Sequence, residues 1–347
     1  MGTLKNNSGG SDTPAVAVVG CGRWGVNLAR NFMALGALKA VCDSNRKHAD
    51  AQAELYGVQA LTFDEVKSDS AITGIVIAVP AAQHYSLACK CLDADKHVFV
   101  EKPLSLRVRD AEDLIQRAAV RERILMVGHL MQYHPAFLCL KDICKKGEIG
   151  NIQYLYSNRL SLGTFRKEEN ALWSFAPHDV SMILSLVDAD IESVCASGSA
   201  FVHEDVADIT VTNLRFVGGQ TAHVFVSWLH PFREQRFVVV GDEGMMVFED
   251  IRDWPEKLVF YPHKTNPAAV PSAPQQAKAE YIPLEPVEPL ELECRHFLDC
   301  MRDGITPRTD GTEGAKVLRV LDAAQKSLTS GNTVLWNELY LENGIVS

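Results

Sequence analysis

A glycine-rich hexapeptide is the clearest chemical motif in the chain. Gly20-Cys21-Gly22-Arg23-Trp24-Gly25 has the spacing G-x-G-x-x-G, and it lies between an apolar run, 15–19, and a segment whose apolar residues recur at helical spacing. Glycines at these positions permit a tight turn and let the backbone approach a pyrophosphate, whose charge then lies at the helix N-terminus. The motif predicts a dinucleotide site, with a purely structural glycine turn as the alternative.

Asp43 ends the next apolar run, 21 residues after Gly22. A carboxylate at this position can accept the ribose hydroxyls and repel the 2′-phosphate of NADP, so the expected cofactor is NAD. Arg46 lies close enough in sequence to keep NADP open, and Asp43 could also be an ordinary residue at the surface end of a strand.

Lys102 is the first candidate catalytic residue. Glu101-Lys102-Pro103 follows the predicted strand 97–100, at the carboxyl edge of the sheet where open α/β folds bind ligands. A lysine there can orient a substrate hydroxyl and stabilise a developing alkoxide. A solvated Glu–Lys pair ahead of a helix fits the same residues.

Two histidines are further candidates. His178 follows Pro177, a residue typical of helix starts, so we expect this histidine near a helix N-terminus. Its imidazole could take a hydroxyl proton while hydride leaves the same carbon, although most histidines are structural or solvated. His84, four residues after Pro80, could line the nicotinamide side of the site or lie on the surface.

Alternating strands and helices must position these residues. Apolar runs at 15–19, 38–42, 58–61, 74–79, 97–100 and 124–127 alternate with helical stretches, which predicts an N-terminal Rossmann domain with a doubly wound parallel sheet over residues 15–128. Residues 1–14 are polar and predicted to form a disordered tail.

The second half has a different pattern. After a predicted helix at 135–146, strands follow strands at 152–158, 191–200, 209–216, 221–228, 236–240 and 245–248, with glycine turns between neighbours. This predicts a C-terminal α+β domain over residues 129–347 with an open, mostly antiparallel sheet. A proline-rich extended connection at 262–289 leads to two closing helices, 290–301 and 312–329, which could pack back on the first domain.

Composition excludes several classes of protein. The 347 residues are 47% hydrophobic and carry a formal charge of −10, so nucleic acid is not an expected partner. No apolar run approaches the ~20 residues of a membrane span. Nine scattered cysteines show no zinc-ligand spacing, so no metal site is expected, and they indicate reduced thiols in the cytoplasm.

Together the Gly20–Gly25 loop, Pro80 with His84, Glu101-Lys102-Pro103 and His178 resemble the Gfo/Idh/MocA family of oxidoreductases over nearly the whole chain. The resemblance implies that Lys102 and His178 form the catalytic pair. It also implies a homodimer or homotetramer assembled through the second-domain sheet.

The residues expected to contact the cofactor, NAD, are Gly20, Gly22, Arg23, Trp24, Gly25, Asp43, Pro80, His84, Glu101 and Lys102.

The segments 171–179 and 227–231 resemble the nucleotide-sugar branch of the family, which includes UDP-N-acetylglucosamine 3-dehydrogenases and the corresponding uronate enzymes. The implied substrate is a sugar, UDP-linked in this branch and a free polyol of the inositol type in the alternative. A NAD-binding sensor without turnover is the non-enzymatic alternative. The residues expected to contact substrate are Gln132, Tyr133, Arg159, Arg166, Trp173 and Asp179, with Arg159 and Arg166 assigned to diphosphate or carboxylate groups.

Two departures from the family limit this transfer. Ser174 stands where many members carry an acidic residue four positions before the histidine, and Gln132 stands where many carry arginine. The resemblance therefore implies neither an acid-assisted His178 nor polyol specificity.

Overall fold

A computed structural model describes residues 14–163, 165–167, 169–263 and 277–338. The chain divides into two compact units, Met1–Gly128 with Leu290–Thr312, and His129–Pro289 with Glu313–Ser347. The predicted tail, residues 1–14, lies outside the described residues except for Pro14, and so does the middle of the predicted proline-rich connection.

Unit 1 is built on six parallel strands in the order β3-β2-β1-β4-β5-β6. The strands are β1 (Val16–Val19), β2 (Leu38–Cys42), β3 (Gln59–Ala60), β4 (Gly74–Ile77), β5 (His97–Glu101) and β6 (Leu125–Gly128). The helices between them are α1 (Gly25–Ala34), α2 (Arg46–Tyr56), α3 (Phe63–Ser68), η1 (Ala81–Gln83), α4 (His84–Asp93) and α5 (Val108–Val120). The predicted doubly wound sheet is confirmed, and strand order reverses between β1 and β4, where such folds bind ligands.

A late segment of the chain completes this unit. In α8 (Pro289–Asp303), the Phe297 ring packs edge-on against Phe32 and Phe99, with ring centroids 6.4 and 5.7 Å apart. Further on, the Thr309 hydroxyl donates to the Val127 carbonyl of β6 at 2.7 Å. The apolar periodicity of α8 is therefore explained by burial against the first sheet.

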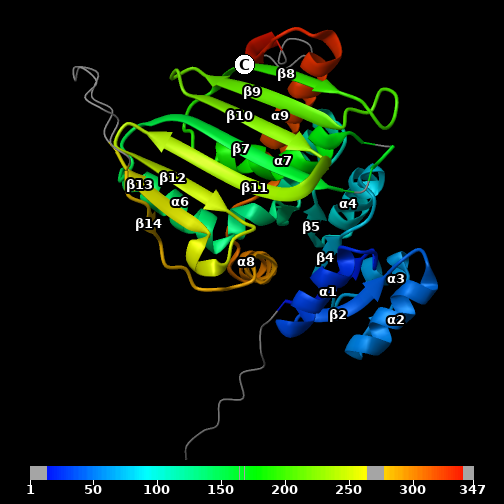
Figure 1. Ribbon diagram of the computed structural model, residues 1–347. Helices are drawn as coiled ribbons and strands as arrows, with labels where there is room; N and C mark the ends of the chain where they lie inside the picture. The colour runs from blue at the N-terminus through cyan, green and yellow to red at the C-terminus, as the bar shows by residue number, and fades with distance from the viewer. Residues whose placement is uncertain (1–13, 164, 168, 264–276, 339–347) are drawn as a thin grey trace, which may run out of the picture. The chain divides into compact units, whose positions relative to one another are not determined.

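Unit 2 contains a nine-stranded sheet, in the order β14-β13-β12-β11-β7-β10-β9-β8-β15 (Figure 1). Among the described residues, only the β7–β10 pair of this sheet is parallel. Its strands are β7 (Ile152–Leu162), β8 (Ile191–Ser199), β9 (Ile209–Phe216), β10 (Thr221–Ser227), β11 (Leu229–Gly241), β12 (Gly244–Glu249), β13 (Leu258–Pro262), β14 (Glu280–Tyr281) and β15 (Val334–Leu335). The predicted open, mostly antiparallel sheet is confirmed, although β13, β14 and β15 were not expected.

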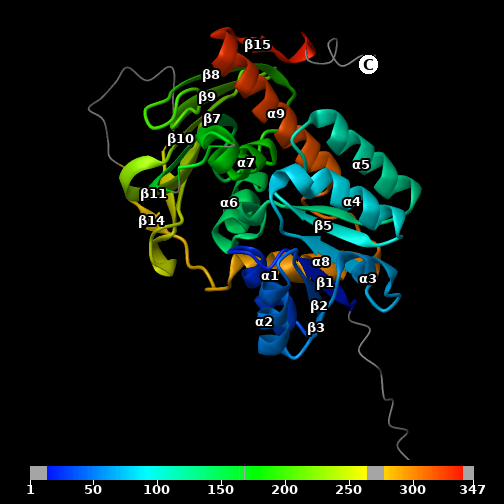
Figure 2. The ribbon, with the colours of Figure 1, turned by 90° about the vertical axis from the view of Figure 1, so that its right-hand side faces the viewer.

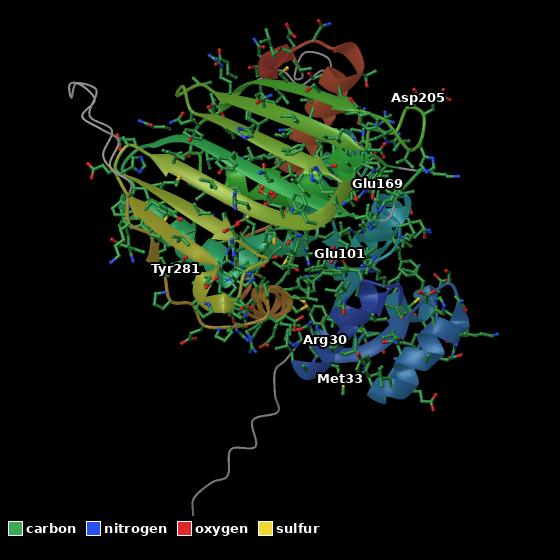
Figure 3. The ribbon with its side chains drawn as sticks, viewed as in Figure 1. Arg30, Met33, Glu101, Glu169, Asp205 and Tyr281 are labelled. Carbon is green, nitrogen blue, oxygen red and sulfur yellow. The ribbon has the colours of Figure 1, made fainter. Side chains whose placement is uncertain are left out.

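Helices cover one face of this sheet, and the other face carries none in the described part of the chain (Figures 1 and 2). They are η2 (Leu130–Tyr133), α6 (Pro135–Lys145), α7 (Ala171–Leu184) and α9 (Gly311–Ser330), while η3 (Trp254–Glu256) lies between β12 and β13. Alternate residues of β10, Ala222, Val224 and Val226, are buried beneath them. Figure 3 labels Tyr281 on the edge strand β14 and Asp205 in the β8–β9 loop.

No helix in the described ranges is both long enough and apolar enough to span a bilayer.

Candidate active site

In the glycine loop of unit 1, two of the glycines are in close contact with backbone atoms and the third faces open space. A Cβ on Gly20, whose φ is +99°, would lie 2.4 Å from the Ala78 carbonyl oxygen, and one on Gly25 would lie 1.8 Å from the Gly20 carbonyl oxygen. A Cβ on Gly22 would meet no described atom within 4 Å beyond those of its chain neighbours. The backbone beside Gly22 therefore offers an open cradle before α1, and this shape fits the pyrophosphate of a dinucleotide.

Asp43 is held against this loop. Its Oδ2 accepts a hydrogen bond from the Cys21 amide at 2.6 Å, and its Oδ1 accepts one from the Asn45 amide at 2.8 Å. Arg46 is paired with Asp50 at 2.7 Å. The carboxylate thus lies beside the loop at the end of β2, as the ribose role requires, while the nearby guanidinium has an acidic partner of its own.

The Glu101-Lys102-Pro103 triplet has anchored neighbours on both sides of the lysine. The Glu101 carboxylate, labelled in Figure 3, accepts from Trp24 Nε1 at 2.5 Å and from the Lys102 amide at 3.3 Å. A Cβ on Gly128 would lie 2.9 Å from this carboxylate, which therefore lies over the end of β6. The backbone that carries Lys102 is fixed at the carboxyl end of β5.

His84 supplies the second anchor. Its Nδ1 lies 2.7 Å from the Pro103 carbonyl oxygen and its Nε2 2.8 Å from that of Val79. Burial lowers the pKa of His84, although both carbonyl partners favour the protonated ring. The histidine predicted to contact cofactor is thus a buried clamp between the segments that follow β4 and β5, and Pro80 lies in one of those segments.

Glu293 was not anticipated from the sequence. It is fully buried in α8, and among the described residues neither of its carboxyl oxygens has a hydrogen-bond partner. Burial, and then the charge of Glu101, raises the pKa of Glu293 well above its usual range. The sequence does hold a signal, because Glu293 falls three residues after Leu290 and four before Phe297, on the apolar face of the helix.

His178 lies in α7 of unit 2, and the predicted helix start at Pro177 is wrong. The helix begins at Ala171, where the Asn170 side chain caps it by accepting from the Trp173 amide at 3.2 Å. Pro177 is therefore inside the helix. His178 is half-buried in the middle of α7, and its ring packs edge-on against the His129 ring at a centroid distance of 6.4 Å.

Two of the residues expected to contact substrate bind each other. Arg159 on β7 donates to both oxygens of Asp179, from Nε at 2.7 Å and from Nη2 at 3.0 Å. The Ser157 hydroxyl donates to the same carboxylate at 2.6 Å. Burial would lower the pKa of Arg159, but Asp179 outweighs it and the pKa is raised. This buried ion pair joins α7 to the sheet.

The other expected substrate residues are divided between interior and surface. Gln132 and Tyr133 are about 1% exposed, and Gln132 Nε2 donates to the Ser181 carbonyl oxygen at 2.8 Å. Trp173 is half-buried and donates to Gln325 at 3.1 Å. Arg166 is exposed and paired with Glu169, which Figure 3 labels in the loop before α7.

Two family models match the chain. The model described as an oxidoreductase family with a NAD-binding Rossmann fold matches residues 15–129, and the GFO/IDH/MocA C-terminal domain matches residues 137–247. Together they span well over half of the chain.

Known proteins are similar over almost the full length. The scyllo-inositol 2-dehydrogenase (NAD(+)) of Bacillus subtilis is 27% identical over 334 residues, which cover 92% of this chain and 95% of that protein. The UDP-N-acetylglucosamine 3-dehydrogenase of Acidithiobacillus ferrooxidans is 26% identical over 307 residues, or 87% and 93%. A solved structure of the enzyme of that name and organism has a TM-score of 0.81 over 90% of this chain and 97% of that one. GenD2 from gentamicin A biosynthesis, solved in complex with NAD, is 24% identical with a TM-score of 0.80 over 97% and 100%.

Proposed function

Because the chain belongs to the Gfo/Idh/MocA family of NAD-dependent sugar and polyol dehydrogenases, we propose that it oxidises the C3 hydroxyl of a UDP-linked N-acetylhexosamine, or of its uronate, to a 3-keto sugar. The similarity to UDP-N-acetylglucosamine 3-dehydrogenase supports this substrate class. A 3-keto nucleotide sugar would serve the synthesis of lipopolysaccharide or another glycan.

The reaction divides between two side chains. Bound NAD supplies the acceptor for the hydride that leaves C3. Lys102 orients the 3-hydroxyl and stabilises negative charge on its oxygen as the C–H bond breaks. His178 takes the hydroxyl proton, so the sugar loses one hydride and one proton in total.

The anchored lysine is the observation that carries the catalytic part. Glu101 is held by Trp24 on one side of Lys102, and the Pro103 carbonyl is held by His84 on the other. Fixing the backbone on both sides of a lysine restricts where its ammonium can lie, which is what orienting a substrate requires. A solvated surface pair would not need an anchor on each side of the lysine, one of them the buried His84.

Recognition of the UDP group is assigned to two groups of unit 2 at or just before the start of α7. Arg159 is already bound to buried Asp179, so Arg166 in the loop before α7 is the better candidate for a diphosphate or carboxylate contact. Trp173, half-buried at the start of α7, offers a flat surface at the same end of that helix.

An inositol-type polyol dehydrogenase is the second candidate, and it is favoured by the 27% identity to scyllo-inositol 2-dehydrogenase. The same lysine and histidine would act on a free ring. In this case Arg166 would have no anionic group to bind.

NADH absorbance after addition of UDP-N-acetylglucosamine, its uronate or myo-inositol to protein with NAD tests the proposal. We expect signal with a UDP-sugar, lost in Lys102→Ala and His178→Ala but kept in Lys90→Ala and His263→Ala, which alter an exposed lysine on α4 and a histidine directly after β13. Signal with myo-inositol alone would replace the proposal with the second candidate. If the protein binds NAD but none of the sugars reduces it, both dehydrogenase candidates are contradicted and a NAD-binding sensor is favoured.

The bare face of the nine-stranded sheet is the proposed surface for a homodimer or homotetramer. Tyr154 on β7 is 41% exposed, and the neighbouring Tyr156 ring stacks on His223 at 5.3 Å on that sheet. A monodisperse monomer in light scattering at micromolar concentration would contradict this assembly.

A further inference from the structure

One carboxylate joins three separate segments of unit 2. Glu313, in the first turn of α9, lies 2.6 Å through Oε2 from Nδ1 of His129 and accepts a hydrogen bond from the Ser181 hydroxyl through Oε1 at 2.5 Å. Gln132 Nε2 in turn donates to the Ser181 hydroxyl oxygen at 3.0 Å. The His129 side chain is 2% exposed and that of Glu313 is 18% exposed, so water competes little for these bonds.

Both partners of Glu313 are next to His178. The His129 ring packs edge-on against the His178 ring, at an interplanar angle of 79°. Ser181 follows His178 by three residues on α7, and residues at this spacing share one face of a helix. Glu313 therefore holds both the ring beside His178 and the helical turn that carries it.

Glu313 differs from the residues at the two α7 positions that could otherwise supply a negative charge to His178. Asp179 is adjacent to His178 in sequence, but Arg159 neutralises it. Ser174, one turn before His178, carries no charge. A carboxylate that accepts Nδ1–H of His129 fixes the tautomer of that ring, as second partners of functional histidines do.

We propose that Glu313, acting through His129 and Ser181, is a positioning residue that holds the His178 imidazole in its proton-accepting orientation. This inference rests on the proposed role of His178 as the base. Glu313 touches neither sugar nor cofactor in this scheme, so its removal should slow the chemical step and leave binding nearly unchanged.

The test compares Glu313→Gln with Lys316→Gln, an exposed residue on the same helix. Glutamine keeps the shape of the side chain but cannot accept from both His129 and Ser181 with two carboxylate oxygens. In Glu313→Gln we expect kcat to fall at least roughly tenfold, which is the smallest effect usually seen when the hydrogen-bond partner behind a functional histidine is removed. The KM values for NAD and for the sugar should stay within about twofold of the wild type. Glu313→Asp, which keeps the charge, should recover part of the loss.

Histidine ring ¹⁵N spectra give a second measurement that does not need turnover. In Glu313→Gln the Nδ1–H signal of His129 and the ring signals of His178 should both move, and Lys316→Gln should move neither. An unchanged kcat in folded Glu313→Gln, or a loss equal to that in Lys316→Gln, overturns the inference. If the wild type oxidises none of the sugars, the proposed function fails. The ¹⁵N signals of His178 then test the positioning role by themselves, and it is overturned if they do not move in Glu313→Gln.

Discussion

Two glycines of the cofactor loop, Gly22 and Gly25, should respond differently to the same substitution. The motif treats Gly22 and Gly25 alike, but a Cβ at Gly25 would lie 1.8 Å from the Gly20 carbonyl oxygen. One at Gly22 would meet no atom of the described residues within 4 Å apart from its chain neighbours. Gly25→Ala should therefore damage the fold of unit 1. Gly22→Ala should leave the fold intact and weaken NAD binding.

The expected magnitudes follow from these distances. Ordinary contact begins near 3.4 Å, so Gly25→Ala requires backbone to move by about 1.5 Å. Overpacking costs ~1–3 kcal/mol and occasionally more, and a clash with backbone belongs at the upper end, about 3 kcal/mol. At ~2–4 °C per kcal/mol, the melting temperature should fall by roughly 6–12 °C. Gly22→Ala should change stability by less than about 1 kcal/mol, with stabilisation expected because alanine restricts the unfolded chain.

Thermal unfolding of both variants, with and without saturating NAD, and calorimetric titration of NAD measure the two effects separately. In Gly22→Ala without NAD we expect a melting temperature equal to or slightly above that of the wild type. The Kd for NAD should rise at least roughly tenfold, or about 1.4 kcal/mol, because the methyl group occupies space that the pyrophosphate approaches. A Gly25→Ala protein as stable as the wild type would refute the packing argument. Unaltered NAD affinity in Gly22→Ala would refute the cradle.

Three further predictions concern buried groups. Asp179→Asn should lower the free energy of unfolding, measured with urea, by about 3 kcal/mol because Arg159 is left buried and unpaired. The double variant Arg159→Met with Asp179→Leu should recover most of this loss. An unchanged urea midpoint in Asp179→Asn would show that the ion pair is dispensable. Burial lowers the pKa of His97 from 6.5 to about 4, so the unfolded chain binds the proton first and stability should fall as pH drops across that interval. His97→Asn, which keeps an acceptor for a backbone amide, should flatten this slope, and an equal slope in both proteins would contradict it. Burial raises the pKa of Cys91 to about 12, so iodoacetamide should label exposed Cys195 first, and mass spectrometry showing early Cys91 labelling would contradict this.

Local patterns carried most of the fold. Strands of unit 1 are short apolar runs between glycine or polar turns, and the helix predicted from Arg46 to Tyr56 has those bounds in the structure because Asn45 caps it and Gly57 ends it. The short helix α3 was missed although Thr62 and Glu65 form a capping box, since only six residues follow the cap. Strand β13 was missed because it lies beside the proline-rich segment, where breaker residues dominate the local pattern.

The helix that carries His178 shows the limit of local rules. Proline is favoured in the first turn of a helix, so Pro177 predicted a helix start. In the structure the cap is Asn170, and proline is accommodated in the interior because α7 is packed into the core of unit 2 on both sides of it. Burial in the core outweighed the local preference of proline for the first turn, and no pattern of residues within α7 predicts a proline inside this helix.

Residue type alone does not separate groups that bind a ligand from groups that hold the fold together. Arg159, Asp179 and His84 have the chemistry of binding residues, yet each uses its hydrogen-bonding groups inside its own unit. Separating a buried polar group from its partner costs a few kcal/mol, and contacts with a ligand would have to offset this cost before they contribute to affinity. Substitution of these residues should therefore lower stability, whereas substitution at open or exposed positions such as Gly22 and Arg166 should lower ligand affinity at constant stability. Measuring both quantities for each variant separates the residues that build the site from those that meet the substrate.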